Sequence, residues 1–357
     1  MKYTQKELCL IWLDSFVGLE YKHKKQLYEY LGENDGIKEL LNSGKDYLVS
    51  ELSENLYNTV YGSANKFYLD SILDGLNKRQ ITCITLESKI YPPQLLNTDI
   101  PPLVLYAKGD VSLLNTEIFG VVGSRKSLTS QLNVAKDICK DLVSSGFTLI
   151  TGIAEGVDKT VITTALENNG KIISVLASGF DNLYPSAHAG LIERVIEKGL
   201  VITEHLPEIQ AKPYFFPVRN RIIAGLSQGV LVVSGNTKSG TLYTAEYAEE
   251  YGRHLFAVPY SPNVESGKGC NMLIKQGAIL TESSSDILEF FGKTIEKQTV
   301  HLTKEQEVIV QAIKDGKNHV EQIAKQLNIP VYQLLPLLSE LEIKGVIVKN
   351  GTNLYGL

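Results

Sequence analysis

The stretch GVLVVSGNTKSGTLYTAEYAEEYG, residues 229–252, contains the pattern that decides the fold. An apolar run with β-branched residues, typical of a buried strand, leads through a turn of small residues into apolar residues at helical spacing. Similar strand-like runs occur elsewhere in the middle of the chain, separated by helical patterns: IFGVVG, FTLIT, KIISVLA, LVITE, HLFAVP and GAILTE. Such alternation predicts a parallel sheet with both faces covered by helices, a doubly wound, Rossmann-like α/β core.

The chain of 357 residues exceeds the length of one ordinary domain. We expect a helical domain, the core with its N-terminal extension, a linker and a C-terminal domain, over residues 1–62, 63–291, 292–300 and 301–357. The N-terminal runs ELCLIWLDSFV and KKQLYEYLG have helical spacing. The turn between them, SFVGLEYKHKK, could form a SAM-like or helix-hairpin-helix element that holds DNA phosphate, but we favour a plain helical hairpin.

The C-terminal region has the element order of a winged helix. Three helical patterns, LTKEQEVIVQAIKDG, HVEQIAKQLNI and PVYQLLPLLSELEIKG, precede a hairpin with an Asn-Gly turn. The third helix, which would read DNA, is rich in leucine, and the region is electrically neutral and lacks arginine. Gln333 is a weak candidate for base contact. We therefore expect a domain with a structural role or protein contacts rather than a reader of duplex sequence.

Composition limits the function further. With 43% hydrophobic residues the chain is typical of a folded globular protein, and its net charge of −5 means that any DNA binding must use a local patch. The four cysteines and six histidines show no metal-ligand spacing, so we expect no metal and a reducing compartment. The sequence shows no membrane-spanning run and no signal peptide. We expect a cytoplasmic protein without membrane contact.

Three strand-to-helix turns of the core are rich in glycine and small polar residues. They are GVVGSRKSLTS, TGIAEGVDKT and SGNTKSGTLYTAEYA. Glycine lets a backbone approach a ligand closely, and the start of the following helix favours an anion. None of the turns matches the Walker A or G-x-G-x-x-G motif, so no nucleotide cofactor is expected. Together they predict an edge of the sheet that binds phosphate groups.

Arginine is rare, with six against 29 lysines, and two of the six lie in FFPVRNRIIAGLSQG, residues 215–229. We expect Arg219 and Arg221 near the first turn of a short helix that starts after Asn220, at the same edge as Arg125 and Lys238. A guanidinium there would grip phosphate with two hydrogen bonds or stack on a base. The buried face of this helix is expected to hold Ile222, Ile223 and Leu226.

An ion pair is the alternative role for these arginines. Asp158 and Glu204 are the carboxylates considered as partners, above all for Arg221, which lies closer to the apolar part of the expected helix. The sequence leaves both roles open.

At these residues the sequence resembles the DNA-processing protein A family, also called DprA or Smf. The segment YPPQLLNTDIPPLVLYAKGD looks like the family's entry segment, and further motifs follow in the family's order: GSRKS, TGIAEGVD, ASGFDNLYP, FPVRNRIIAGLS, KSGTLYTAEYA, GRHLFAVP and GCNMLIKQGA. FPVRNRIIAGLS is the most specific. The resemblance covers most of the chain and implies the same three-part architecture.

The resemblance implies a protein that is not an enzyme, binds single-stranded DNA without sequence preference and loads the recombinase RecA onto it in natural transformation or recombination. Single-strand-binding protein is a further implied partner. Phe215 and Phe216 could each stack on a base or pack in the core, and we expect one of the two in each role. The expected DNA-binding residues are Gly123, Ser124, Arg125, Lys212, Phe216, Arg219, Asn220, Arg221, Lys238, Ser239 and Gly240.

The resemblance also implies a homodimer formed through the core. We consider Met272, Leu273 and Ile274 for its interface, with an ordinary core-packing helix as the alternative.

Three positions depart from the family pattern. Ile162 stands where a histidine is usual, Ser234 where a glutamate is usual, and Tyr260 where a glycine is usual. The first two changes remove titratable groups that an enzyme would use, while the arginines and glycine turns are retained. The departures therefore weaken an enzymatic interpretation more than a binding one.

The main alternative is a nucleotide- or nucleotide-sugar-processing enzyme. The KSGT turn followed by Glu246 looks similar to the PGGxGT…E pattern of lysine-decarboxylase-like phosphoribohydrolases. Such an enzyme needs carboxylates near the reacting atoms, and Asp158, Glu204 and Glu246 are the candidates. A winged-helix transcription factor is a third class, which the neutral, leucine-rich third helix of that domain disfavours.

Overall fold

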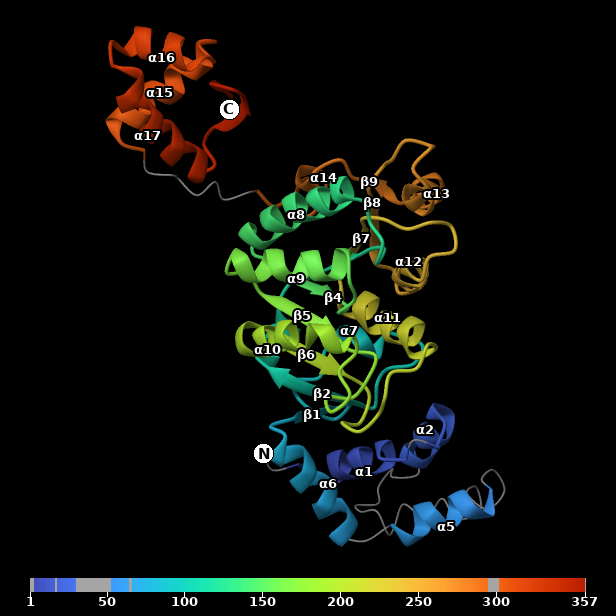
Figure 1. The fold of residues 1–357 in the computed structure, drawn as a ribbon. Coiled ribbons are helices and arrows are strands. Elements are labelled where there is room, and N and C mark those ends of the chain that lie inside the picture. Colours follow the sequence, from blue (N-terminus) through green and yellow to red (C-terminus); the bar gives the residue numbers. More distant parts are fainter. Residues whose placement is uncertain (1–2, 17, 30–52, 64–65, 295–301, 357) are drawn as a thin grey trace. The chain divides into compact units, whose positions relative to one another are not determined.

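The computed structural model describes residues 3–16, 18–29, 53–63, 66–294 and 302–356. The chain forms two compact units, Met1–Ile295 and Glu296–Leu357, each with its own hydrophobic core (Figure 1). The break between them falls within the expected linker, most of which lies outside the described residues.

A nine-stranded sheet runs through the first unit. Its strands are β1 (Thr82–Thr85), β2 (Val104–Gly109), β3 (Ile118–Val122), β4 (Thr148–Thr151), β5 (Ile172–Val175), β6 (Leu200–Thr203), β7 (Gly229–Val232), β8 (His254–Ala257) and β9 (Ile279–Leu280). The spatial order is β1-β2-β6-β5-β4-β3-β7-β8-β9. Strands β3 to β9 pair in parallel, and each lies in one of the seven predicted runs, which confirms the Rossmann-like core. β1 and β2 are antiparallel additions outside those runs.

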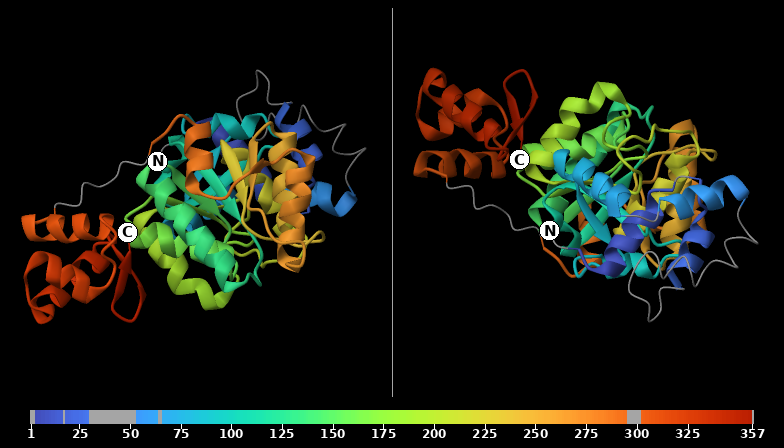
Figure 2. Two further views of the ribbon diagram at one scale, coloured as in Figure 1. Left: turned by 90° about the horizontal axis from the view of Figure 1, so that it is seen from above. Right: turned by 90° about the horizontal axis from the view of Figure 1, so that it is seen from below.

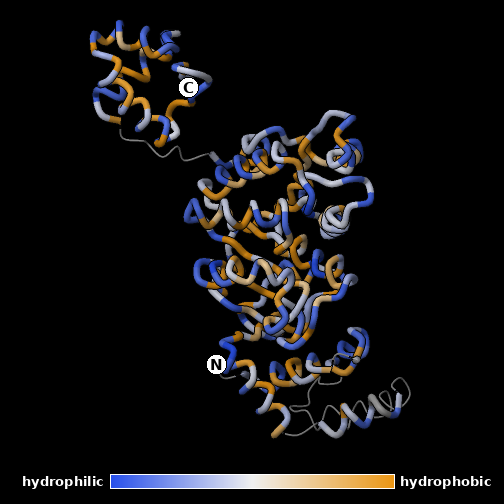
Figure 3. The backbone as a smooth tube through the Cα atoms, in the orientation of Figure 1, coloured by the Kyte–Doolittle hydropathy of each residue, from blue (hydrophilic) through white to orange (hydrophobic). Residues whose placement is uncertain are grey.

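Helices cover both faces of the sheet (Figure 1 and Figure 2). They are α7 (Pro93–Leu96), α8 (Thr129–Ser144), α9 (Val157–Glu167), α10 (Ala189–Lys198), α11 (Phe215–Leu226), α12 (Thr241–Glu250), α13 (Lys268–Gln276) and α14 (Ser284–Phe290). Successive strand residues alternate between two hydrophobic clusters: Val121 packs with α8, α9, α10 and α14, and Val122 with α7, α11, α12 and α13. Burial on both faces explains the nearly continuous apolar strands, which Figure 3 shows as hydrophobic segments inside the unit.

The N-terminal helices share a core with the sheet instead of forming a separate one. They are α1 (Gln5–Asp14), α2 (Tyr21–Glu29), α5 (Glu54–Gly62) and α6 (Lys66–Lys78). Leu10 and Trp12 are fully buried in the same cluster as Tyr106 of β2, whose hydroxyl donates to Asp14 Oδ2 at 2.8 Å. The expected boundary at residue 62 therefore lies inside one compact unit. The turn considered for DNA phosphate includes residue 17, which is outside the described residues.

The second unit is a winged helix, as the sequence predicts. Helices α15 (Lys304–Lys314), α16 (Val320–Leu327) and α17 (Val331–Ile343) precede the hairpin of β10 (Val348–Gly351) and β11 (Leu354–Gly356). Leu334, Leu338 and Leu341 of α17 are buried in its core. The leucine content of the third helix is thus largely explained by packing.

The strand order locates the functional edge of the sheet. From β3 the chain proceeds outward through β4, β5 and β6, then returns to β7 on the other side of β3 and proceeds outward through β8 and β9. The order therefore reverses between β3 and β7. In open α/β sheets, ligands bind outside the carboxyl ends of the strands at such a point. Among the described helices, none combines the length and apolarity required to cross a membrane.

Candidate nucleic-acid interface

A cavity of about 740 Å³, here called the first cavity, lies at the carboxyl ends of β3 and β7. Nine of the eleven expected DNA-binding residues line it, and Lys212 and Arg221 do not. The lining residues are Val122, Gly123, Ser124, Arg125, Lys126, Leu128, Gly152, Ala154, Asp158, Phe216, Pro217, Arg219, Asn220, Ile223, Asn236, Lys238, Ser239, Gly240, Thr241, Thr244, Asn263, Val264, Glu265 and Ser266. The structure thus brings the three glycine-rich turns together around one space.

The turn after β3 presents Arg125 to this cavity. A Cβ on Gly123 would lie 2.4 Å from Val157 Cγ2, so only glycine lets the turn pack against α9. The Ser124 amide donates to Ser234 Oγ at 3.0 Å, which fixes the turn to the end of β7. Arg125 is exposed, and its guanidinium lies 5.0 Å from the centre of the Phe216 ring. The turn is rigid, while the charge that it carries faces solvent.

The turn after β4 passes close beneath two buried charges. A Cβ on Gly152 would lie 2.4 Å from Asp158 Oδ2 and 2.6 Å from Arg219 Nη2. Gly156 has φ +79°, and a Cβ there would lie 2.4 Å from the Ser124 carbonyl oxygen, so this position also requires glycine. Asp158 Oδ2 accepts from the Ala154 amide at 3.1 Å. Burial raises the pKa of Asp158, and the positive charge of Arg219 opposes that rise.

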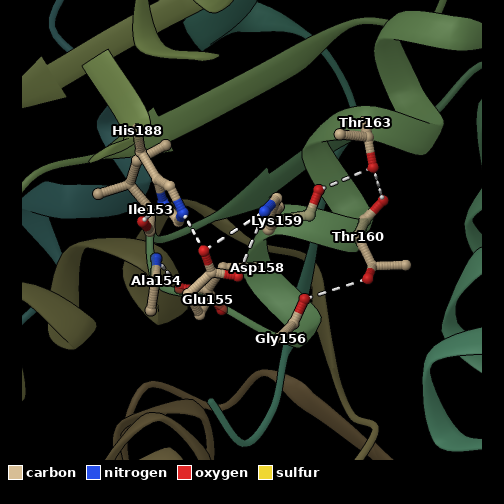
Figure 4. A network of polar contacts seen from close by, with 9 residues as sticks. All are labelled: Ile153, Ala154, Glu155, Gly156, Asp158, Lys159, Thr160, Thr163 and His188. Atoms are coloured by element: carbon tan, nitrogen blue, oxygen red, sulfur yellow. Dashed lines mark hydrogen bonds and ion pairs between the residues drawn. The ribbon is translucent and has the colours of Figure 1, made fainter. Parts of the chain in front are cut away.

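A polar network secures the outer side of this turn (Figure 4). His188 is buried, with Nδ1 2.7 Å from the Ile153 carbonyl oxygen and Nε2 2.7 Å from Glu155 Oε1. Both partners are acceptors, so the ring donates to both only when it carries two protons. The hydrogen bond from His188 lowers the pKa of Glu155. Lys159 Nζ forms an ion pair with Glu155 Oε1 at 3.3 Å, so Glu155 connects His188 to the first turn of α9.

The turn after β7 leads into the start of α12. Asn236 Oδ1 accepts from the Lys238 amide at 3.0 Å, and the Ser239 hydroxyl accepts from the Thr241 amide at 3.3 Å. Lys238 is exposed beside them. Gly240, Thr241 and Thr244 line the cavity, so the positive end of α12 faces it. This is the arrangement of a helix start that favours an anion.

Helix α11 begins earlier than expected, at Phe215, and Asn220 lies inside it. The expected start was wrong because a proline is compatible with the first turn, where its missing N–H has no helical partner. Ile222, Ile223 and Leu226 are buried as predicted.

Arg219 lines the first cavity but is only 6% exposed. Its Nη1 donates to the Val175 carbonyl oxygen. Burial lowers the pKa of Arg219 to about 10, while Asp158 raises it. Arg219 is therefore a positive charge that is buried in the wall of the first cavity and held in place by its hydrogen bond.

Arg221 does not share this cavity, so the expected common placement of the two arginines was wrong. It is 5% exposed and forms an ion pair with Glu204, which is the alternative that the sequence left open. Residues two apart in a helix differ by about 200° in direction, so Arg219 and Arg221 face opposite sides of α11. Arg221 lines a second cavity of about 370 Å³, which is bounded by α2, the 100–104 segment, the end of β6 and α11. Its assignment to DNA binding stays a prediction.

Aromatic side chains lie around the start of α11. Phe215 and Phe216 are both half-buried, and they line the second and the first cavity respectively. Tyr184 is 49% exposed with its ring 5.7 Å from that of Phe216, and Tyr214 is 59% exposed. Lys212 is exposed, with Nζ 5.8 Å from the Tyr214 ring centre. Sequence reasoning missed both tyrosines, although Tyr184 lies in the ASGFDNLYP motif and Tyr214 directly precedes FFPVRNR.

The first cavity has a positive balance of charge. Among its described lining residues, Arg125, Lys126, Arg219 and Lys238 oppose Asp158 and Glu265. Glu265 pairs with Lys268 at 2.5 Å, and burial raises the pKa of Asp158. The described residues contain no group of three or more histidine, cysteine or acidic side chains placed to hold a metal. The electrostatics therefore suit an anionic ligand, although the whole chain is acidic.

The positions that depart from the family pattern have structural roles. Ser234 accepts from the Ser124 amide and lies 2.6 Å from Ser127 Oγ, so it joins β7 to the Arg125 turn. The Tyr260 hydroxyl donates to the Val233 carbonyl oxygen at 2.7 Å. Ile162 is buried in the core. These substitutions are accommodated by packing and hydrogen bonds around an intact first cavity.

The residues considered for a dimer interface lie on α13. Leu273 is buried in the core, whereas Met272 and Ile274 are partly exposed and pack against it. Leu273 thus has the core-packing role that was the alternative, and a dimer through this helix stays a prediction.

Comparison with known proteins identifies the family. The sequence model of DNA recombination-mediator protein A matches residues 82–292, and that of the DprA winged helix domain matches residues 296–350. Protein Smf of Escherichia coli (strain K12) is 34% identical over 290 residues, which cover 78% of each chain.

Two solved structures match the architecture. The X-ray structure of DprA from Streptococcus pneumoniae aligns with a TM-score of 0.69 and 29% identity, covering 81% of this chain and 98% of that one. A structure of DNA processing protein A from Helicobacter pylori, described for its single-stranded DNA binding mode, aligns with a TM-score of 0.54 and 25% identity, covering 59% and 95%. With the fold, the three turns and these matches in agreement, the chain belongs to the DNA recombination-mediator protein A family, whose relatives carry the names DprA and Smf.

Proposed function

We propose that this protein binds single-stranded DNA without sequence preference and mediates recombination by loading RecA onto the strand, in the cytoplasm and in natural transformation where the cell takes up DNA. The observation that carries the proposal is the first cavity, where exposed Arg125 lies over Phe216 beside Lys238 and the start of α12. The single-stranded DNA binding described for the Helicobacter pylori relative supports the same ligand.

The binding mechanism is mainly electrostatic. Phosphates of one strand lie against Arg125, Lys126 and Lys238, and Arg219 adds a positive charge from behind the surface. Each neutralised phosphate releases counterions, so the affinity falls as salt rises. Bases stack on Phe216 and its neighbour Tyr184, which is sequence-tolerant because every base has a π-face.

RecA loading requires that the protein hold the strand while leaving part of it accessible. Backbone turns and arginines grip phosphates, so base edges stay available for the recombinase. A homodimer through the α13 surface around Met272 and Ile274 would double the phosphate-binding strip and increase the affinity for longer strands. Displacement of single-strand-binding protein would follow from competition for the same strand.

The nucleotide-processing alternative requires carboxylates that converge on one reacting group. Asp158 lines the first cavity, Glu204 lines the second and is paired with Arg221, and Glu246 is exposed on α12 outside both linings. This dispersion supports binding over acid–base catalysis.

Fluorescence anisotropy with a labelled poly-dT strand and a matching duplex, each at two salt concentrations, tests the proposal. We expect salt-sensitive preference for the single strand. Arg125→Glu should weaken that binding by at least about tenfold, because it replaces an exposed cation of the first cavity by an anion. Arg194→Glu, at an exposed position of α10 outside the cavity lining, is the charge-matched control.

Near wild-type binding of a folded Arg125→Glu variant would contradict the assignment of the first cavity. Absence of binding to either DNA form at low salt, together with turnover of a nucleotide, would favour the enzyme instead. If the strand binds, the lag of RecA assembly on strands covered by single-strand-binding protein tests loading directly.

A further inference from the structure

The second cavity contains buried polar atoms that the described part of the protein leaves without partners. Arg221 Nε and Nη1, Glu204 Oε1 and His205 Nε2 are all buried and make no hydrogen bond to described residues. Native proteins pair the large majority of such atoms with protein groups or ordered water. Here four of them come from three residues that line the same cavity, and Arg221 is 5% exposed. Several unpartnered polar atoms around one cavity are expected where a bound ligand supplies their hydrogen-bond partners.

The charges of this cavity cancel. Arg221 pairs with Glu204, and Lys24 Nζ pairs with Asp14 Oδ1 at 3.1 Å. Burial lowers the pKa of His205, which favours its neutral form. Two cations and two carboxylates give no net attraction for an anion. A neutral ligand that both accepts and donates hydrogen bonds is the better match, because guanidinium N–H groups of Arg221 and a carboxylate oxygen of Glu204 lack partners among the described residues.

The remaining walls favour a flat, partly apolar group. The rings of Phe215 and His205 lie 4.2 Å apart, and Leu19, Leu103 and Ile209 contribute apolar surface. Val218 and Ile100 are each 39% exposed at this cavity. A volume of about 370 Å³ is within the range of small-molecule sites.

We propose that the second cavity receives a nucleobase, which accepts hydrogen bonds from Arg221 and donates one to Glu204. The base comes either from the bound strand, in which case the site extends the function proposed above, or from a free nucleoside. The path from the strand is short in sequence, since Phe216 lines the first cavity and Phe215 the second. Exposed Tyr214 directly precedes this pair, and exposed Lys212 lies two residues before Tyr214; both would hold the strand where it passes from the first cavity to the second.

The first experiment uses the full chain and free deoxynucleosides, which lack the phosphate that the first cavity binds. Saturation-transfer NMR and calorimetry should detect thymidine or deoxyguanosine. Val218→Trp fills the cavity from a partly exposed position without replacing either member of the ion pair, and should weaken this binding by about tenfold. Val331→Trp, at a position of the winged helix with 38% exposure, is the matched control and should leave it unchanged.

The second experiment distinguishes the source of the base. Anisotropy compares a poly-dT strand with a strand of the same length whose central nucleotides are abasic. If the strand supplies the base, the wild-type protein should prefer the intact strand, and Val218→Trp should reduce that preference by about fivefold or more. If only free nucleosides use the cavity, Val218→Trp should change nucleoside binding alone.

The outcomes separate this proposal from the proposed function. Strand binding that depends on Arg125, with no nucleoside binding by the wild-type protein and no effect of Val218→Trp on base preference, means that the second cavity holds only water and overturns the nucleobase site. If a folded Arg125→Glu variant binds the strand as well as the wild-type protein does, the proposed function is overturned instead. Nucleoside binding with equal affinity in wild type and a folded Val218→Trp variant also overturns the site.

Discussion

The two cavities lie on opposite sides of one helix, and they differ in what their charges can do. The first presents exposed cations around a ring of backbone turns and has an excess of positive charge. The second buries its cations against carboxylates and has no net charge. Arg219 and Arg221 are two residues apart in the sequence, yet each belongs to a different cavity. A pair of similar residues in one motif is therefore not evidence for one shared role.

The same comparison explains why burial alone does not define function. Both arginines are about 95% buried, at 6% and 5% exposure. Arg219 acts on the first cavity through its field, because its lowered pKa of about 10 still leaves it charged at neutral pH. Arg221 is neutralised by the neighbouring Glu204. The two arginines therefore differ in their partners, because Arg221 forms an ion pair with Glu204 whereas Arg219 donates to the Val175 carbonyl oxygen.

The largest expected effect comes from breaking the ion pair of the second cavity. Arg221→Met leaves Glu204, whose side chain is only 15% exposed, without its partner, and we expect a loss of about 3 kcal/mol in the free energy of unfolding. Denaturant titration measures it. The double variant Glu204→Met/Arg221→Met should recover most of the loss, because replacing both partners removes the unpaired charge. A single variant as stable as wild type would show that the pair contributes nothing to stability.

The next effect concerns the rigid turns of the first cavity. Gly156→Ala places a Cβ 2.4 Å from the Ser124 carbonyl oxygen at a positive φ, so we expect about 2 kcal/mol of destabilisation and weaker strand binding as the Arg125 turn shifts. Gly190→Ala in α10 is the control, since its Cβ would meet no atom within 4 Å. The control should be neutral or stabilising by up to about 1 kcal/mol. Unfolding and anisotropy of the two variants test this, and equal stability would contradict the strain argument.

Ligand binding at the two cavities should differ in its dependence on salt concentration. If Arg125, Lys126 and Lys238 each neutralise one phosphate, a fourfold rise in salt weakens single-strand binding by about twentyfold. Deoxynucleoside binding to the second cavity should change by less than about twofold, because its charges cancel. Anisotropy and calorimetry over the same salt series provide the comparison. Equal salt dependence of the two ligands would mean that they share one site.

The smallest expected effect is on pH dependence. The folded pKa of Glu155 is lowered by its hydrogen bond with His188, so this contact stabilises the fold above the unfolded pKa of about 4.5 and is lost as pH falls through the folded value. Glu155→Gln should therefore flatten the acid side of a Tm-versus-pH curve. Glu193→Gln, on an exposed residue of α10, is the control. Identical acid limbs in wild type and Glu155→Gln would exclude a contribution from this contact.

Much of the fold was predictable because local patterns determine it. Strands buried on both faces must be apolar throughout, so β3 to β9 were recognisable from short β-branched runs. The winged helix was predictable from three sequence patterns with helical spacing, followed by a hairpin with an Asn-Gly turn. β1 and β2 were missed, although residues 103–107 (LVLYA) at the start of β2 form an apolar run like those of the predicted strands. The shared core of the N-terminal helices and the sheet also depends on contacts far apart in sequence.

For the candidate site, the sequence by itself determined which turns carry glycine, serine and arginine, since tight strand-to-helix turns restrict residue type. It also determined the family, through the order of its motifs. Only the tertiary structure decided that Arg221 turns away from Arg219 toward Glu204, that Tyr184 joins Phe216, and that four unpartnered polar atoms meet in a second cavity. The physical reason is that a helix fixes the angle between neighbouring side chains, whereas the group that each one meets is set by packing between distant segments.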